Sequence, residues 1–347
     1  MQALILAGGQ GIRLRPLTIN TPKPIVPIGN EPFLLRQIQS LKSAGVRDIT
    51  LSTGYQPSAI EKALGNGSRY DVNLRYLVEP APMGTAGAYK FAEEFLKTTT
   101  LVLNGDILTD IDLRQVAKHH FNYSSTATIV LTRVENPSAY GLVEVGKNNE
   151  VLRFLEKPKA DEINRMNINT INAGIYILEP KVLDFIPKNE NHSFEYQLFP
   201  HLLQKQEKFH AFVANDNYWL DIGTPERYLK AHCDLMMGRI KNFRISKNSN
   251  FQLSPGAEID DKSCIADGCV IKLGAKIINS VLGKDVVIEE NTIVKNSVIW
   301  ARTKVKSDTS ILDSIIGNDC RIGRNALVSN GSVLGDKTII ANFALSS

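Results

Sequence analysis

Glycines and cations are concentrated near the start of the chain, in the run LILAGGQGIRLRPLTINTPKP from Leu4 to Pro24. Glycines stand at positions 8, 9 and 11, and three cations follow within eleven positions: Arg13, Arg15 and Lys23. Glycine lets a backbone pass close to a ligand and leaves N–H groups free to point at it. The cations supply countercharge, and the planar fork of arginine matches phosphate oxygens two at a time. This spacing predicts a polyphosphate site.

The loop matches neither of the two commonest phosphate-binding motifs. A P-loop closes with Gly-Lys-Ser/Thr, whereas Gly11 is followed by Ile12 and Arg13. The dinucleotide fingerprint needs a third glycine where Leu14 stands. The chemistry therefore belongs to a different class of phosphate-binding protein.

Two aspartates stand at the ends of apolar runs and could hold a metal ion. Asp106 ends the run LVLNGD, and Asp221 closes YWLD before IGTPE. Chemistry on a polyphosphate depends on charge neutralisation by metal and cations, and Mg²⁺ prefers oxygen ligands. For Asp221 a helix cap is the alternative role, because Gly-Thr-Pro follows shortly after it. Asp112 lies near Asp106 and is predicted to cap the next helix.

Strand-like runs alternate with amphipathic segments from residue 1 to about 235. The expected strands are 2–7, 48–53, 72–78, 100–104 and 127–132, and a helix fits 32–44. Strands joined by helix-length crossovers imply an α/β fold with a Rossmann-like, mostly parallel sheet flanked by helices. Ligands gather at the carboxyl ends of such strands. The glycine loop and Asp106 both follow predicted strands, so we expect them at that edge.

A different period governs residues 251–347. Isoleucines recur every six residues at 259, 265, 271 and 277, and the run IINSV at 277–281 is echoed at 294–298 and 311–315. The first residues of these three runs are 17 positions apart, which equals two six-residue steps and one five-residue step. Hexapeptide periodicity predicts a parallel β-helix with about three short strands per coil. The polar and basic stretch 236–250 reads as a linker, so the predicted domains are 1–235 and 251–347.

Composition excludes several classes of protein. The 347 residues suit two domains, and a net charge of +4 is too mild for a general nucleic-acid binder but fits small anionic substrates. No apolar run approaches the roughly 18 residues of a membrane span. The four cysteines lack C-x-x-C spacing and do not cluster with histidines, so we expect no zinc site. We expect a cytoplasmic protein with free thiols that binds neither nucleic acid nor membrane.

The opening run resembles the signature of the sugar-phosphate nucleotidyltransferases, G-G-x-G-T-R-L-x-P-L-T followed by P-K-P. The matching residues are Gly8, Gly9, Gly11, Arg13, Leu14, Pro16, Leu17, Thr18, Pro22, Lys23 and Pro24. Ile12 departs from the pattern, which usually has threonine, and the lost hydroxyl predicts a slower enzyme. The resemblance covers residues 1 to about 235. The C-terminal repeats resemble the left-handed β-helix that several of these enzymes carry.

The resemblance implies a role for each matching motif. The catalytic residues would be Arg13, Lys23 and, from the E-K-P element, Lys157. The nucleotide would contact Leu6, Ala7, Gly8, Gly9, Gly11, Ile12, Glu79, Pro82, Gly84 and Thr85. The sugar would contact Gly141, Glu156, Asn172, Ala173 and Gly174. Mg²⁺ would be held by Asp106 and Asp221.

Glu79 indicates which base is read. Guanine offers two adjacent donors, N1–H and the 2-amino group, which suit a carboxylate that accepts twice. Thymine and uracil present one N–H between two acceptors, and thymidylyl members tend to carry glutamine at this position. An adenine or cytosine amino group could also donate to Glu79. The run Gly84-Thr85-Ala86-Gly87 resembles the mannose-1-phosphate guanylyltransferase branch, which favours GTP and mannose 1-phosphate as the substrates and GDP-mannose as the product.

Other activities stay open at this point. One is a glucose-1-phosphate nucleotidyltransferase using dTTP, UTP, CTP or ATP, and another is a regulatory paralogue that binds nucleotide sugar without making it. Acyl transfer by the β-helix is disfavoured, because such domains usually use a histidine base and no histidine follows His232. We expect the β-helix to mediate self-association of the chain.

Overall fold

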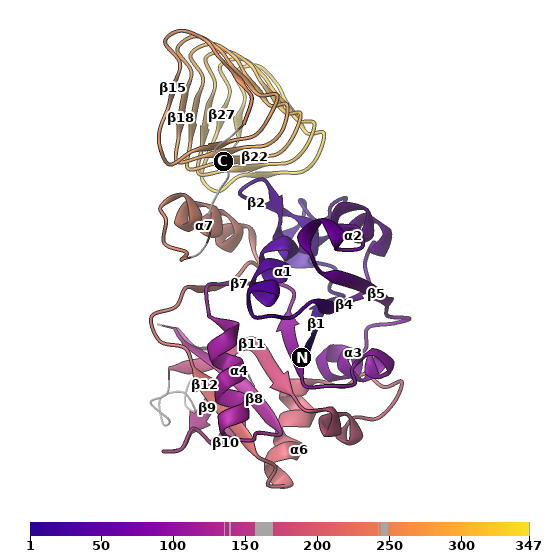
Figure 1. The fold of residues 1–347 in the computed structure, drawn as a ribbon. Helices are drawn as coiled ribbons and strands as arrows, with labels where there is room; N and C mark the ends of the chain where they lie inside the picture. The colour runs from indigo at the N-terminus through magenta and orange to yellow at the C-terminus, as the bar shows by residue number, and fades with distance from the viewer. Residues whose placement is uncertain (135, 139, 157–168, 242, 244–248, 347) are drawn as a thin grey trace. The chain divides into compact units, whose positions relative to one another are not determined.

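The computed structural model describes residues 1–134, 136–138, 140–156, 169–241, 243 and 249–346 (Figure 1). By its contacts the chain divides into two compact units. The first unit joins Met1–Gly9 to Leu34–Trp219, and the second joins Gln10–Phe33 to Leu220–Ser347. Each unit is described by itself.

The first unit is built on a mixed sheet, which has nine strands within the described residues. Its path runs β10-β9-β11-β6-β1-β4-β5, and β8 pairs with both β11 and β12. The strands are β1 (Gln2–Ala7), β4 (Asp48–Thr53), β5 (Asn73–Val78), β6 (Thr100–Asn104), β8 (Ala127–Arg133), β9 (Leu142–Val145), β10 (Val151–Leu155), β11 (Thr170–Leu178) and β12 (Phe209–Val213). The four strands β6, β1, β4 and β5 are parallel, as the sequence predicts, whereas β11 runs antiparallel to β6, β8 and β9.

Helices flank this sheet. They are α1 (Phe33–Ser43), α2 (Pro57–Leu64), α3 (Gly84–Phe91), α4 (Leu113–Asn122) and α6 (Phe199–Gln204), with a π-helical turn η6 (Phe194–Leu198) and short 3₁₀ turns η3 (Ser68–Tyr70), η4 (Glu93–Phe95) and η5 (Pro180–Phe185). Asp112 caps α4 by accepting a hydrogen bond from the Arg114 backbone N–H at 3.0 Å, which confirms the predicted cap. Buried aromatic rings of Tyr89, Tyr176, Phe194 and Phe199 join α3, β11 and α6 in one apolar core.

The strand register brings several loops to one edge of the sheet. Ala7 pairs with Thr53, and Thr53 pairs with Val78. Leu6 pairs with Asn104 on the other side of β1. The turns after these strands therefore carry their side chains to the same carboxyl edge, as parallel pairing dictates. After β6 the chain turns through residues 105 and 106 into β7 (Ile107–Thr109).

The β-helix of the second unit stacks short strands into three parallel sheets, and Figure 1 shows the triangular section of its coils. The first sheet holds β14 (Gln252–Leu253), β17 (Val270–Ile271), β20 (Val287–Ile288), β23 (Lys304–Val305), β26 (Arg321–Ile322) and β29 (Ile339–Ile340). The second holds β15 (Glu258–Ile259), β18 (Lys276–Ile278), β21 (Ile293–Lys295), β24 (Ser310–Leu312), β27 (Leu327–Val328) and β30 (Leu345–Ser346). The third holds β16 (Cys264–Ile265), β19 (Val281–Leu282), β22 (Val298–Ile299), β25 (Ile315–Ile316) and β28 (Val333–Leu334).

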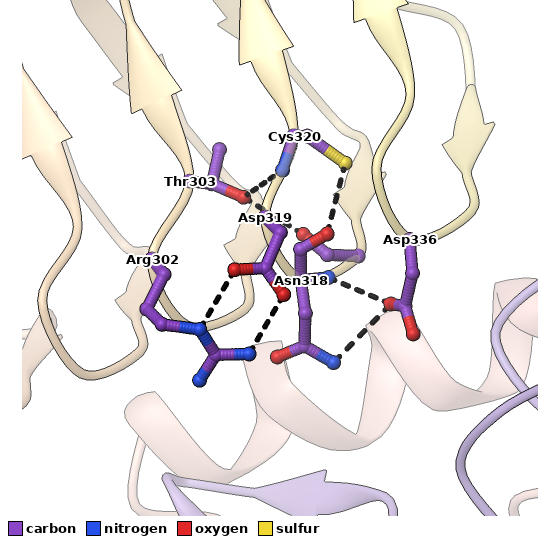
Figure 2. A network of polar contacts seen from close by, with 7 residues as sticks. Arg302, Thr303, Asn318, Asp319, Cys320 and Asp336 are labelled. Atoms are coloured by element: carbon purple, nitrogen blue, oxygen red, sulfur yellow. Dashed lines mark hydrogen bonds and ion pairs between the residues drawn. The ribbon is translucent and has the colours of Figure 1, made fainter.

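The corners of the coils explain the repeat of two sixes and a five. Residues with positive φ stand at 285, 291, 296, 302, 308 and 313, so the spacing runs six, five, six, six, five. Most are Asn or Asp, which tolerate the left-handed conformation. Side chains also bond along the stack, as when Arg302 pairs with Asp319 one coil later (Figure 2). The first and the last coils contain 18 residues rather than 17, since Gln252 is opposite Val270 and Ile315 is opposite Val333. In the last coil both Asn330 and Gly331 have positive φ.

The rest of the second unit packs around Pro27. It comprises η1 (Ile12–Leu14), η2 (Lys23–Ile25), β2 (Pro27–Ile28), β3 (Glu31–Pro32) and α7 (Pro225–Met236), and β13 (Trp219–Asp221) leads into α7. The Tyr228 hydroxyl donates to the Pro27 carbonyl and accepts from Trp300 Nε1 at 3.0 Å. Among the residues described, no helix has the length and apolar character needed to cross a membrane.

Candidate active site

Glu79, the predicted base-reading residue, lies in the first unit, where it faces Gly8. Glu79 follows β5, and a β-carbon at Gly8 would lie only 2.7 Å from its Oε1 atom. Oε1 accepts a hydrogen bond from the Ser52 hydroxyl at 2.7 Å, and Oε2 accepts one from the Met83 backbone N–H at 3.3 Å. A carboxylate has about four lone-pair sites, so each oxygen can still accept a second donor. Ser52 and Met83 thus orient Glu79 beside the end of β1.

The loop that follows Glu79 leads into α3. Gly84 has φ +71°, and a β-carbon there would lie 2.6 Å from the His192 carbonyl oxygen. Only glycine meets both conditions. Thr85 donates from its hydroxyl to Glu195 Oε2 at 2.9 Å, and the Pro82 carbonyl accepts from Asn191 at 2.8 Å. The predicted nucleotide residues Pro82, Gly84 and Thr85 are therefore held by the segment 191–195.

The sugar-side residues are brought together by an irregularity in β11. Its register against β8 shifts between Asn172 and Tyr176, and Gly174 has φ +71° within this stretch. A β-carbon at Gly174 would lie 2.7 Å from Asn104 Nδ2, so glycine allows the end of β6 to approach. Asn172 Oδ1 accepts from the Gly174 N–H at 2.9 Å, and its Nδ2 donates to the Tyr176 hydroxyl at 2.8 Å. The predicted sugar residues therefore lie beside the strand end that leads to Asp106.

The other predicted sugar residues surround the same strand. The Gly141 carbonyl accepts from the Asn172 N–H at 2.9 Å, and a β-carbon at Gly141 would lie 2.5 Å from Glu156 Oε2. Ala173 accepts from Trp219 Nε1 at 2.9 Å. Lys157, the predicted catalytic lysine, lies outside the described residues.

Glu195 is a site carboxylate that the sequence analysis missed. Its Oε2 accepts from the hydroxyls of Thr85 at 2.9 Å and Ser193 at 2.6 Å, and its Oε1 accepts from the Tyr176 hydroxyl at 3.3 Å. Burial, and next the Glu195 charge, raise the pKa of Tyr176 well above its usual value, so the phenol stays a donor. Glu195 therefore links the nucleotide-side Thr85 to the sugar-side β11. In the sequence, the nearest signal for Glu195 is Ser193, two residues earlier, which is indistinguishable from an ordinary helix cap.

The remaining phosphate-loop residues lie in the second unit. Gly11 has φ +64°, and a β-carbon there would lie 3.0 Å from Cβ of Lys23. The Thr18 hydroxyl donates to the Gly11 carbonyl at 2.7 Å, which fixes this turn. Lys23 is buried at the start of η2, whereas the Ile12 side chain is 61% exposed. Within this unit the structure thus brings Gly11 and Lys23 together, as the motif predicts.

Asp221 pairs with the guanidinium group of Arg227, and the Arg13 guanidinium lies near the neighbouring Gly223. Asp221 Oδ1 accepts from the Gly223 N–H at 2.7 Å, and its Oδ2 forms an ion pair with Arg227 of α7. A β-carbon at Gly223 would lie 2.5 Å from Asp221 Oδ1 and 2.9 Å from the Arg13 guanidinium. The absence of a side chain at Gly223 therefore lets Arg13 approach Asp221. The cap of α7 is Thr224, whose side chain accepts from the Arg227 N–H, and not Asp221.

The two predicted metal ligands belong to different units of the structure, Asp106 to the first and Asp221 to the second. Asp106 and Asp221 offer carboxylate oxygens, the donors that Mg²⁺ prefers. Among the described residues, no group of three or more His, Cys, Asp or Glu side chains could hold a metal. Mg²⁺ commonly binds through one or two carboxylates together with substrate phosphates, so it needs no larger protein cage. Each carboxylate is thus chemically suited to a metal that arrives with a nucleotide.

Two known protein families match this chain. Residues 2–237 match the family described as "Nucleotidyl transferase", and residues 243–344 match the left-handed β-helix described as "EIF2B subunit epsilon LbH domain". The chain belongs to the nucleotidyl transferase family. It is an enzyme with a C-terminal left-handed β-helix, and enzymes of this family generally use a divalent metal.

Characterised relatives extend along most of the chain. A mannose-1-phosphate guanyltransferase of Pichia angusta is 38% identical over 322 residues, which cover 88% of this chain and 85% of the relative. A mannose-1-phosphate guanylyltransferase of Mycobacterium tuberculosis is 34% identical, covering 85% and 83% of the two chains. Among solved structures, a Bacillus anthracis protein named "Putative Glucose-1-Phosphate Thymidylyltransferase", in complex with a sucrose, aligns with a TM-score of 0.62 and 26% identity over 70% of this chain and 97% of its own.

Proposed function

We propose that the chain transfers a guanylyl group from GTP to mannose 1-phosphate, forming GDP-mannose and pyrophosphate. The observation that carries the choice of base is the orientation of Glu79 against Gly8 by Ser52 and Met83. A carboxylate held in this way can accept from both N1–H and the 2-amino group of guanine. The choice of sugar is supported by relatives at 34% and 38% identity that are mannose-1-phosphate guanylyltransferases.

The chemistry requires positioning and charge more than proton transfer. An oxygen of the sugar phosphate, already ionised at neutral pH, attacks the α-phosphorus of GTP in line, and pyrophosphate leaves. The Gly8–Gly11 amides, Arg13 and Lys23 would hold the triphosphate, and Lys157 would hold the sugar phosphate. Leu6, Ala7, Gly9 and Ile12 complete the nucleotide contacts of this proposal. Gly141, Glu156, Asn172, Ala173 and Gly174 would position the sugar.

A divalent metal, Mg²⁺ in this proposal, would be held by Asp106 and Asp221. When bound, it would neutralise charge on the phosphates during transfer. Arg13 lies near Asp221, so the same region would also offer a guanidinium to a phosphate oxygen. Glu195 acts as a positioning residue in this proposal, because it contacts Thr85 and Tyr176 rather than the reacting atoms.

A second candidate is transfer from dTTP to glucose 1-phosphate. It is favoured by the structural similarity to the Bacillus anthracis thymidylyltransferase, at a TM-score of 0.62. Glu79 argues against it, since thymine would turn a carbonyl acceptor toward one of the carboxylate oxygens. We therefore rank this activity below guanylyl transfer.

The direct test is pyrophosphate release by the purified chain with GTP, mannose 1-phosphate and Mg²⁺. The proposal expects metal-dependent release of pyrophosphate together with GDP-mannose, identified by mass spectrometry. Binding of GDP-mannose without any turnover would instead identify a regulatory paralogue. Replacing Asp106 by Asn is the matched control, because it removes the metal-binding charge and keeps the shape of the side chain.

The organisation of the chain completes the proposal. Residues 1–235 would be the catalytic domain, 236–250 the linker, and 251–347 a β-helix through which copies of the chain associate. All four cysteines, at 233, 264, 269 and 320, are free thiols. Since disulfides form in oxidising compartments, free thiols support a cytoplasmic enzyme.

A further inference from the structure

Gln37 is a polar residue on the buried face of α1. Leu34 and Leu41, three residues before it and four residues after it, are fully buried, and Gln37 itself is only 6% exposed. Residues three and four positions apart share one face of a helix, so Gln37 occupies a position in the apolar stripe of α1. Burying a primary amide is unfavourable unless its polar atoms find partners. The partners of this amide therefore indicate what it does.

The Gln37 amide donates to both ends of the turn that follows β6. Its Nε2 atom lies 2.8 Å from the Asn104 carbonyl oxygen and 3.0 Å from the Ile107 carbonyl oxygen. Carbonyl oxygens can only accept, so the atom that faces them is the amide nitrogen, and both of its N–H groups are used. The two residues between the bonded carbonyls are Gly105 and Asp106. One side chain therefore holds the turn that carries Asp106 on both sides.

The end of β1 fixes the same turn within the first unit. The Gly105 N–H donates to the Leu6 carbonyl at 2.8 Å, and a β-carbon at Gly105 would lie 2.6 Å from that carbonyl oxygen. Only glycine lets the turn approach β1 this closely. Three hydrogen bonds, one to Leu6 and two from Gln37, therefore fix the backbone on which the half-buried Asp106 stands.

The oxygen of the same amide indicates that Gln37 serves the turn more than the core. Among the residues described, Gln37 Oε1 is buried and has no hydrogen-bond partner. A buried acceptor without a partner is costly, and departures of this kind are expected at functional sites, where they are offset elsewhere. The cost at Oε1 accompanies two well-formed bonds from Nε2, and both of those bonds lead to the turn that carries Asp106.

We propose that Gln37 is a positioning residue for the metal-binding carboxylate of Asp106. The inference rests on the proposed function, because it takes Asp106 as a metal ligand. Groups that orient a metal ligand contribute to affinity without touching the metal, and their loss typically weakens binding by about 10- to 100-fold. Gln37 acts through the backbone: it holds the carbonyls of Asn104 and Ile107, and these set the direction in which the Asp106 side chain leaves the turn.

Binding of Mn²⁺ to the full chain without nucleotide tests the proposal. Gln37→Met keeps the length of the side chain and removes both donors, so it should raise the dissociation constant of Mn²⁺ about tenfold, measured by electron paramagnetic resonance. Thr100→Val is the matched control and should leave this constant unchanged, because it removes a buried hydroxyl that donates to the Thr98 carbonyl at the opposite end of β6. Thermal unfolding establishes that each variant is folded. If Gln37→Met does not fold, Gln37→Asn replaces it, since its shorter amide cannot bridge both carbonyls.

Combining the change with Asp106→Asn separates positioning from a general effect on the fold. Because Gln37 acts through Asp106, Gln37→Met should add nothing to the weakening of Mn²⁺ binding that Asp106→Asn causes alone. Additive effects, an unchanged dissociation constant in Gln37→Met, or equal weakening by Thr100→Val would overturn the proposal while Asp106 remains a metal ligand. Mn²⁺ binding that is unaffected by Asp106→Asn would instead remove the metal role of Asp106 from the proposed function, and this inference with it.

Discussion

Asp221 is held by a guanidinium group at the position where the proposed function needs a metal ligand. The Arg227 side chain pairs with its Oδ2, and Arg13 lies close to its Oδ1. A cation beside a carboxylate competes with a metal for the same oxygen lone pairs. We infer that metal binding requires Asp221 to exchange the Arg227 contact for the metal, at a cost set by a partly exposed ion pair.

Replacing Arg227 by Gln should therefore tighten metal binding in the absence of nucleotide. We expect the dissociation constant of Mn²⁺, used as a spectroscopic substitute for Mg²⁺, to fall by a factor of about 3 to 10, or roughly 1 kcal/mol. Electron paramagnetic resonance of free Mn²⁺ measures it. Arg239→Gln is the matched control, because it breaks a comparable ion pair with Asp234 near the end of α7. Unchanged or weaker Mn²⁺ binding in Arg227→Gln would show that the ion pair does not compete with the metal.

Ile12 lacks the hydroxyl with which threonine at this position of the glycine loop could bond to a phosphate. Its side chain is 61% exposed, so a hydroxyl at this position would be accessible to a bound phosphate. Ile12→Thr should raise kcat/KM, at most about a hundredfold, since a hydrogen bond to a charged group contributes roughly 1.5–3 kcal/mol. Steady-state kinetics measures the gain. Ile12→Val keeps the β-branch without the hydroxyl and should give none, and an equal gain in both variants would refute the account.

At the scale of elements, the fold could be predicted wherever apolar residues recur along the sequence with a regular period. The expected strands 2–7 and 48–53 coincide with β1 and β4, and the expected helix 32–44 is α1 at Phe33–Ser43. The predicted coil of two sixes and a five is confirmed by the spacing of the positive-φ corners. The antiparallel strands β9, β10 and β11 were not predicted, because the period of a strand does not report the direction of its neighbour.

Candidate site residues could be predicted only where they belong to a recognisable sequence motif. Gly8, Glu79 and Asn172 were named from the sequence, and the structure shows Glu79 against Gly8 and Asn172 beside Gly174. Two residues that hold site side chains in place, Ser52 against Glu79 and Glu195 against Thr85, were not named. Their contacts join residues 27 and 110 positions apart, and nothing local in the sequence marks them.

The corners of the β-helix provide a test of how its coils are stabilised. Asn296 has φ +48°, accepts from Asn279 at 2.8 Å and donates to Asp313 at 3.0 Å. Asn296→Ala should lower the free energy of unfolding by about 1–3 kcal/mol, because it loses both bonds and strains a left-handed residue. Asn296→Gly loses the bonds but tolerates the backbone, so its cost should be smaller. Urea unfolding measures both. An equal cost would mean that backbone strain plays no part.

At the scale of the whole molecule, we expect the β-helix to mediate self-association. Ile278 of β18 and Ile293 of β21 are 36% and 37% exposed on neighbouring strands of one sheet. In this register Ile278 is opposite Lys295 and Ile293 is opposite Lys276, so the two isoleucines lie diagonally on one exposed face. We expect two copies of the chain to meet there.

Introducing charge on this face should reduce the mass of the particle in solution. The double variant Ile278→Asp, Ile293→Asp should shift the mass measured by light scattering toward that of a single chain, because association would bury two carboxylates. Leu273→Asp places the same charge at a residue that is 57% exposed in the turn between β17 and β18, and it should leave the mass unchanged. A single-chain mass for the unmodified protein, or an equal effect of Leu273→Asp, would exclude this surface.

The most direct test of the account compares kcat/KM across nucleotides and sugars. Pyrophosphate release would be measured with GTP, UTP, dTTP, ATP and CTP, each against mannose 1-phosphate and glucose 1-phosphate. The account predicts one maximum, at GTP with mannose 1-phosphate, and a loss of the preference for GTP in Glu79→Gln. A maximum at dTTP or UTP with glucose 1-phosphate, or a preference for GTP that survives in Glu79→Gln, would contradict it.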